Sequence, residues 1–163
     1  TLGWSSVAVG TLLASWVIGY GVVQGLTPVV TGLSGGRVPD GRTLLRWTLL
    51  LAGVPIAIAV GMGSISQGQW VLIAGLLLFG FVFAVNSAVH SYLILSYAEL
   101  DGVTLDVGFY YMSNAGGRLV GTLLSGWIFQ VYGFAACLLV SGGLVLLAVI
   151  VSIGLPQARH LKN

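Results

Sequence analysis

One arginine stands inside an apolar stretch that is long enough to cross a lipid bilayer. The stretch is DVGFYYMSNAGGRLVGTLLSGWIFQ, residues 106–130, and Arg118 lies near its middle. A guanidinium at membrane depth is tolerated only where it faces protein, a bound partner or water. Asp106 is too far along the same helix to neutralise Arg118. We therefore expect this helix to line a polar cavity on the side of Arg118.

The same stretch carries small residues at every fourth position. These are Ser113, Gly117, Gly121 and Ser125, which fall one helical turn apart. Small side chains let the backbone of a second helix approach closely in a membrane. The stripe therefore predicts helix packing on this face.

Other polar side chains fall at a similar depth in two further apolar runs. Counting helical rise from the predicted cytoplasmic ends of the spans puts Arg118 roughly 18 Å into the membrane, Asn86 about 16 Å, Gln24 about 14 Å and His90 about 10 Å. We predict one polar layer near the midplane. Asn86 and His90 have an alternative role, which is to hydrogen-bond a neighbouring helix. The candidate substrate-binding residues are Arg118, Asn114, Asn86, His90, Gln24 and Tyr20.

The composition is that of a membrane protein. Hydrophobic residues make up 57% of the 163 residues and charged residues 6%, a balance that a water-soluble surface does not tolerate. Apolar runs separated by short polar connections predict an all-α, polytopic membrane protein with residues 1–163 as one unit. We expect five transmembrane helices, at about residues 5–33, 43–63, 70–97, 107–131 and 135–155.

The basic residues predict the orientation. Five spans put Arg37, Arg42, Arg46, Arg159 and Lys162 on one side of the membrane. Cytoplasmic connections are enriched in Lys and Arg, so we expect a cytoplasmic C-terminus. The opening TLGWSS has neither an initiator Met nor a basic region typical of a signal peptide. We interpret the chain as the tail of a longer protein.

Several functional classes find no support in the sequence. It contains no nucleophile elbow, HExxH, CxxC or phosphate loop, so we predict no enzyme activity, no catalytic residue and no cofactor. A single membrane His without a neighbouring acid makes a poor metal site. The net charge of +2 is too small to indicate nucleic-acid binding.

Three segments resemble known transporters. GRVPDGR (36–42) is similar to the cytoplasmic loop motif of major facilitator transporters, with Gly36, Asp40 and Arg42 in place, although Gly41 stands where a basic residue is usual. FAVNSAVHSYLILSYA (83–98) and LDVGFYYMSNAGGRLVGTLLSGWIFQVYG (105–133) are more specific. Together the three resemble the organoarsenical efflux permeases of arsenic-resistance operons, the ArsJ type, over almost the whole chain.

The resemblance implies a fold and a cargo. The five spans would be helices 8 to 12 of a twelve-helix transporter, so the partner of this chain would be the N-terminal half of the same protein. The family is thought to export 1-arseno-3-phosphoglycerate, an organic anion made with a glyceraldehyde-3-phosphate dehydrogenase, from the bacterial inner membrane. Arg118 would hold its phosphate or arsenate group with two parallel hydrogen bonds.

Two alternatives stay open. The same kind of transporter could carry another organic anion or phosphate ester. The chain could instead be a membrane assembly or sensor subunit that does not transport, in which the polar residues only join helices.

Overall fold

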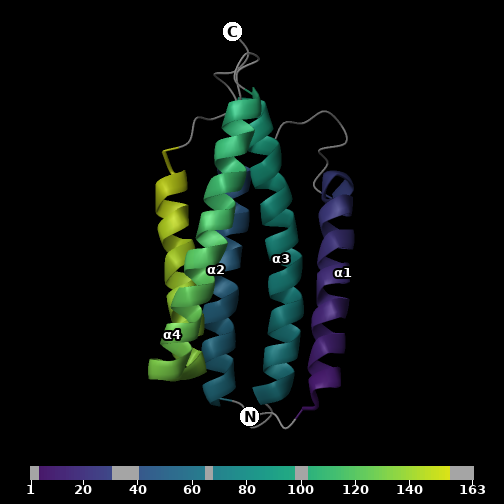
Figure 1. The fold of residues 1–163 in the computed structure, drawn as a ribbon, viewed down its shortest axis with the longest axis vertical. Coiled ribbons are helices and arrows are strands. Elements are labelled where there is room, and N and C mark those ends of the chain that lie inside the picture. Colours follow the sequence, from purple (N-terminus) through teal and green to yellow (C-terminus); the bar gives the residue numbers. More distant parts are fainter. Residues whose placement is uncertain (1–3, 31–40, 65–67, 98–102, 155–163) are drawn as a thin grey trace.

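Four long α-helices make up the described part of the chain. The computed structural model describes residues 4–30, 41–64, 68–97 and 103–154, and its helices are α1 (Ser6–Val30), α2 (Gly41–Ser64), α3 (Gly68–Tyr97) and α4 (Val103–Ser152) (Figure 1). All four are long and apolar enough to cross a membrane. The chain is therefore a multi-pass, all-helical membrane protein.

The predicted count of five helices is not matched, because the last two predicted spans belong to a single element, α4, which is bent within its length. Its 50 residues include one non-helical residue, Gly133, with φ 80° and ψ −177°. This backbone conformation is essentially restricted to glycine. The Cys137 thiol donates a hydrogen bond of 3.3 Å to the Ser125 carbonyl, whereas a straight helix would separate these residues by about 18 Å. The chain thus reverses at Gly133, and we call residues 103–132 the first limb of α4 and 134–152 the second limb (Figure 1).

The first three predicted spans agree with the structure within a few residues. The span 5–33 corresponds to α1, 43–63 to α2 and 70–97 to α3. Pro28 lies in the last turn of α1, and Pro55 lies inside α2. Long apolar runs are the strongest signal for membrane helices because every backbone hydrogen bond must be satisfied within the segment.

α2 lies at the centre of the helix packing. It contacts α3 on one side and α4 on another, whereas α1 contacts only α3 strongly and lies at the outer edge of the bundle (Figure 1). A buried cluster of Leu44 from α2 with Val85, Val89 and Leu93 from α3 joins the two central helices. Val23 of α1 packs against the same cluster. These contacts bring the polar middle of α3 between α1 and α2.

Glycines permit the closest helix contacts. A Cβ added at Gly80 of α3 would lie 2.7 Å from the Trp16 indole nitrogen of α1, which donates a hydrogen bond of 2.8 Å to the Leu76 carbonyl. In the second limb of α4, a Cβ at Gly142 would lie 2.6 Å from the Ile56 side chain and 3.2 Å from the Ala52 carbonyl of α2. Backbone approach of this kind is how membrane helices pack tightly.

Candidate functional site

Arg118 lies on the exposed side of the first limb of α4. Its Nε donates a hydrogen bond of 3.1 Å to Oδ1 of Asn114, one helical turn earlier. Asn114 is half-buried, so its side chain is anchored at the edge of the bundle while the guanidinium extends outward. Asp106 is the only acid that the described residues contain, and it lies about 18 Å away along the helix axis. The guanidinium is therefore oriented by an amide and has no acid of its own helix beside it.

The small-residue stripe makes no close helix contact within the described chain. Ser113, Gly117, Gly121 and Ser125 are all exposed, and a Cβ added at Gly117 or Gly121 would meet no atom within 4 Å. Tyr110 and Ile128 lie on the same face of the limb, and they are half-buried and buried. The face therefore touches the bundle at its ends and is open in the middle. Packing of the stripe stays a prediction that needs another polypeptide.

Asn86 of α3 has a partner that the sequence did not suggest. Asn86 is 7% exposed, and its Oδ1 accepts a hydrogen bond of 2.9 Å from the hydroxyl of Thr48 on α2. Thr48 is 2% exposed, and its hydroxyl also lies 2.9 Å from the Leu44 carbonyl. Sequence reasoning named no candidate binding residue on α2, because a lone Thr in an apolar run commonly bonds only its own backbone. The geometry gives Asn86 a structural bond between α2 and α3.

Three other candidates are half-buried around the same level of the bundle. His90 and Gln24 lie on α3 and α1, and the structure shows no hydrogen bond from either side chain to another described residue. Tyr20 of α1 stacks on Trp16 with ring centroids 5.9 Å apart and meets Phe83 of α3 at 5.5 Å. Tyr20 thus helps to join α1 to α3 through its ring.

One contact relates the depths of α3 and the first limb of α4. The hydroxyls of Ser91 and Tyr110 lie 3.4 Å apart. The two segments run in opposite directions from this contact, so Asn86 lies about 7.5 Å and Arg118 about 12 Å further to the same side. The two residues therefore share a similar depth, as expected for one polar layer. No hydrogen bond joins Arg118 to Asn86, His90, Gln24 or Tyr20 in the described part of the structure.

The loop motif is described only at its end. Gly36 and Asp40 lie outside the described residues, whereas Arg42 is exposed in the first turn of α2. No group of three or more His, Cys, Asp or Glu side chains that could hold a metal ion occurs among the described residues.

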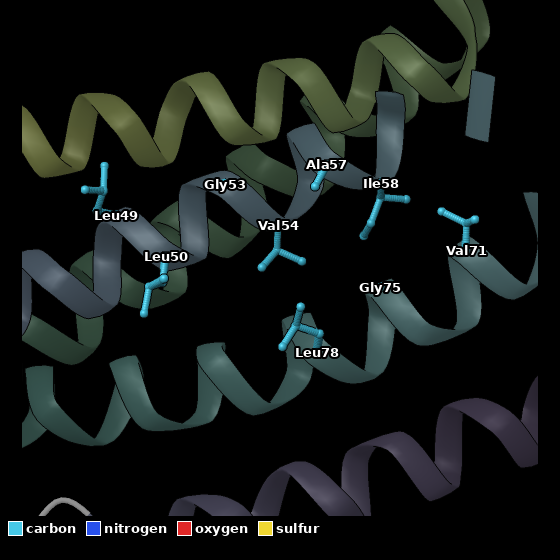
Figure 2. A pocket seen from close by; sticks show the side chains of 9 residues that line it. All are labelled: Leu49, Leu50, Gly53, Val54, Ala57, Ile58, Val71, Gly75 and Leu78. Atoms are coloured by element: carbon cyan, nitrogen blue, oxygen red, sulfur yellow. The ribbon is translucent and has the colours of Figure 1, made fainter. Parts of the chain in front are cut away.

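A groove between α2 and α3 is separate from these candidates. It has a volume of about 420 Å³ and is lined by Leu, Val, Ile, Ala and Gly side chains without a titratable group (Figure 2). None of the six candidate substrate-binding residues lines it. The groove therefore does not provide the polar surroundings that an anion needs.

Comparison with known proteins gives the family. No curated protein and no solved structure matches the chain significantly. The family model described as Major Facilitator Superfamily matches residues 1–163, the entire chain. Four helices that are long and apolar enough to cross a membrane agree with this match. The chain therefore belongs to the major facilitator superfamily of membrane transporters.

Proposed function

We propose that the chain is the C-terminal half of an efflux transporter that binds an organic anion at Arg118 and exports it by alternating access. The observation that carries this proposal is the state of the Arg118 side chain. The residue lies at the depth of the predicted polar layer, is exposed, and is held through Nε by Asn114. A cation at this depth needs an anion, water or another protein group to be tolerated.

The hydrogen bond from Nε leaves the terminal nitrogens of Arg118 for a ligand. Neither terminal nitrogen bonds a described residue. A guanidinium uses two parallel N–H groups to hold a phosphate-like or carboxylate group, a contact that an ammonium cannot copy. The open middle of the Gly117 and Gly121 face lies within one turn of Arg118 and leaves room for a small ligand. An organic anion with a tetrahedral oxyanion group fits this arrangement.

The proposed cargo is 1-arseno-3-phosphoglycerate, which would give the cell resistance to arsenate. This part of the proposal rests on the resemblance of residues 36–42, 83–98 and 105–133 to the organoarsenical permeases. That resemblance also implies a functional link to a glyceraldehyde-3-phosphate dehydrogenase and a location in the bacterial inner membrane. Another phosphate ester or organic anion would use the same guanidinium contact.

The remainder of the binding site would come from an N-terminal half. Central sites in this type of transporter lie between two helical halves near the bilayer midplane. The exposed first limb of α4 is the surface that would complete such a site, because Arg118 is exposed and a Cβ at Gly117 or Gly121 meets no atom of the other described helices within 4 Å. The basic residues at the start of α2 favour a cytoplasmic C-terminus.

A non-transporting scaffold is the second candidate. The bond between Thr48 and Asn86 favours it, since this polar pair joins helices without a ligand. The same explanation does not extend to Arg118, whose side chain bonds only Asn114 of its own helix within the described residues.

The test is efflux of the arsenylated anion per folded molecule of the whole transporter. We expect Arg118→Gln to reduce efflux by roughly 100-fold, because at least two charge-assisted hydrogen bonds are lost. Arg118→Lys keeps the charge without the planar fork and should retain a fraction of the activity. The folded yield of both variants should match the wild type.

Two outcomes would contradict the proposal. Full efflux by Arg118→Lys would exclude the two-pronged contact. Loss of folded yield in parallel with efflux in both variants would assign Arg118 to structure. Efflux of an unrelated phosphate ester, but not of the arsenylated anion, would keep the site and change the cargo.

A further inference from the structure

The groove between α2 and α3 is apolar along its whole length. Figure 2 shows Val54 of α2 and Leu78 of α3 pointing toward one another across it, with Ile58 and Val71 nearer one end. Gly75 lies at the closest approach, because a Cβ there would fall 2.3 Å from the Ile58 side chain. From this contact the groove continues toward Leu49 and Leu50 near the start of α2. Such a lining offers dispersion contacts and no hydrogen bond.

The groove opens sideways, away from the packed centre of the bundle. Leu50 is 56% exposed and Leu78 53% exposed, whereas Val54 and Ile58 are buried at its floor. Both helices are long and apolar enough to cross a membrane, so a groove that opens sideways between them would face lipid rather than water. Hydrocarbon is the material that fills an aliphatic groove at this depth at least cost.

Two arginines continue the groove toward the membrane surface. Arg46 precedes Leu49 and Leu50 by three and four residues, which places it on the same face of α2. Arg42 lies one turn further toward the start of the helix, and both arginines are exposed. The sole acid within the described ranges, Asp106, is on α4. One helix face therefore carries two cations followed by the aliphatic lining.

The dimensions match one lipid leaflet. Twelve residues separate Arg46 from Ile58 at the far end of the groove, which corresponds to about 18 Å of helix. The hydrocarbon of one leaflet is about 15 Å thick. If the Arg46 guanidinium lies at the level of the lipid headgroups, the groove below it is therefore about as long as one acyl chain.

We propose that this face of α2 and α3 binds an anionic phospholipid, with its phosphate held by Arg42 and Arg46 and one acyl chain in the groove. The charge and the lining select this occupant. A zwitterionic lipid would use the groove and gain less from the arginines, whereas a helix of another chain would have no use for two cations directly above an aliphatic face. Each arginine near an anionic headgroup contributes about a fivefold gain in affinity, so two contribute roughly 30-fold.

The test is native mass spectrometry of the purified chain with phosphatidylglycerol or phosphatidylcholine of identical acyl chains. We expect one phosphatidylglycerol to bind roughly 30-fold more tightly than phosphatidylcholine. Replacing both arginines, Arg42→Gln with Arg46→Gln, should remove this preference, and the matching pair of Lys variants should keep it. These substitutions lie on an exposed surface, so folding should not change.

A second variant tests the groove independently of charge. Gly53 lines the groove, and a Cβ there meets no atom within 4 Å, so the backbone accepts a side chain at this position and Gly53→Leu should occupy part of the groove. It should weaken binding of both lipids. The matched control is Gly19→Leu on α1, which is equally free of contacts and lies outside the groove.

Three outcomes would overturn the proposal. Equal binding of the two lipids to the wild type would remove the role of the arginines. Unchanged lipid binding by Gly53→Leu would remove the role of the groove. A wild-type dimer that Gly53→Leu converts to a monomer would show that a second copy, and not a lipid, occupies this face.

Discussion

Polar side chains have opposite surroundings in two regions of the molecule. One region is the interface between α2 and α3, and the other is the first limb of α4. Between α2 and α3, Thr48 and Asn86 are almost fully buried and bond each other across the two helices. In the first limb, Arg118 and Asn114 bond within one helix, and the guanidinium remains exposed. Ile128 is the one buried hydrophobic residue of that limb within the described chain.

The difference separates two uses of polarity at membrane depth. Two buried polar groups that hydrogen-bond each other join their helices and need no ligand or water as a further partner. A polar group held by its own helix and facing outward requires water, a ligand or another polypeptide. By this criterion Asn86 belongs to the structure of the bundle, and Arg118 belongs to the proposed anion site. Both had the same status as sequence candidates.

The largest expected effect on stability comes from a substitution at one glycine of α4, and a second glycine of the same helix serves as its control. Gly142→Leu forces a side chain into Ile56 and the Ala52 carbonyl, so it should lower the free energy of unfolding by about 3 kcal/mol. A Cβ at Gly121 meets no atom within 4 Å, so Gly121→Leu should leave the stability of the isolated chain unchanged. Thermal unfolding in detergent, followed by circular dichroism, measures both.

Gly121→Leu also tests the predicted packing of the small-residue stripe. If another helix covers this face in the whole transporter, the same substitution should lower the folded yield there and not in the isolated chain. Equal yields in both settings would show that the face stays open to lipid or ligand. A strong destabilisation of the isolated chain by Gly121→Leu would contradict the geometry itself.

A smaller effect is expected at the buried polar pair. Thr48→Val removes the donor to Asn86 and should cost about 1 kcal/mol, the usual scale of a hydrogen bond between membrane helices. In a double-mutant cycle with Asn86→Ala, we expect a coupling free energy of similar size. Efflux per folded molecule should be unchanged in Thr48→Val. A selective loss of efflux would return Asn86 to the binding site.

Sequence reasoning found the apolar spans, because long hydrophobic runs leave little choice of structure in a membrane. It placed a break between residues 131 and 135, and Gly133 is the residue with non-helical dihedral angles, but the two predicted spans are joined there without a separate connection. A glycine in a sequence does not distinguish these cases, since it serves both helices and turns. Thr48 escaped notice because its partner is 38 residues away. The groove was equally hidden, since Leu, Val and Gly on a membrane helix look alike whether they face lipid, protein or a cavity.

The sequence predicted which residue types belong to the candidate site, but it did not predict which of these residues lie together in the structure. Helical rise placed Arg118 and Asn86 at a similar depth, and the contact between Ser91 and Tyr110 agrees with that estimate. Depth does not determine which way a side chain points. That direction depends on which face of a helix packs against its neighbours. The structure supplies this information through the contacts of α2 with α3 and α4.

The smallest expected effect concerns Asn114, which separates orientation of the guanidinium from folding. Asn114→Ala removes one hydrogen bond to Nε of Arg118 and should reduce efflux about fivefold, the equivalent of roughly 1 kcal/mol. Stability should be unchanged, because the bond is exposed and lies within one helix. Asn114→Asp keeps the acceptor but adds a negative charge beside Arg118, so the carboxylate should compete with the anion and reduce efflux more than Ala does. Measuring the concentration dependence of efflux distinguishes these effects, since competition by the carboxylate should raise KM. If Asp supports normal efflux, an anion does not bind at this guanidinium, and the outward-facing Arg118 must find its partner in another part of the transporter.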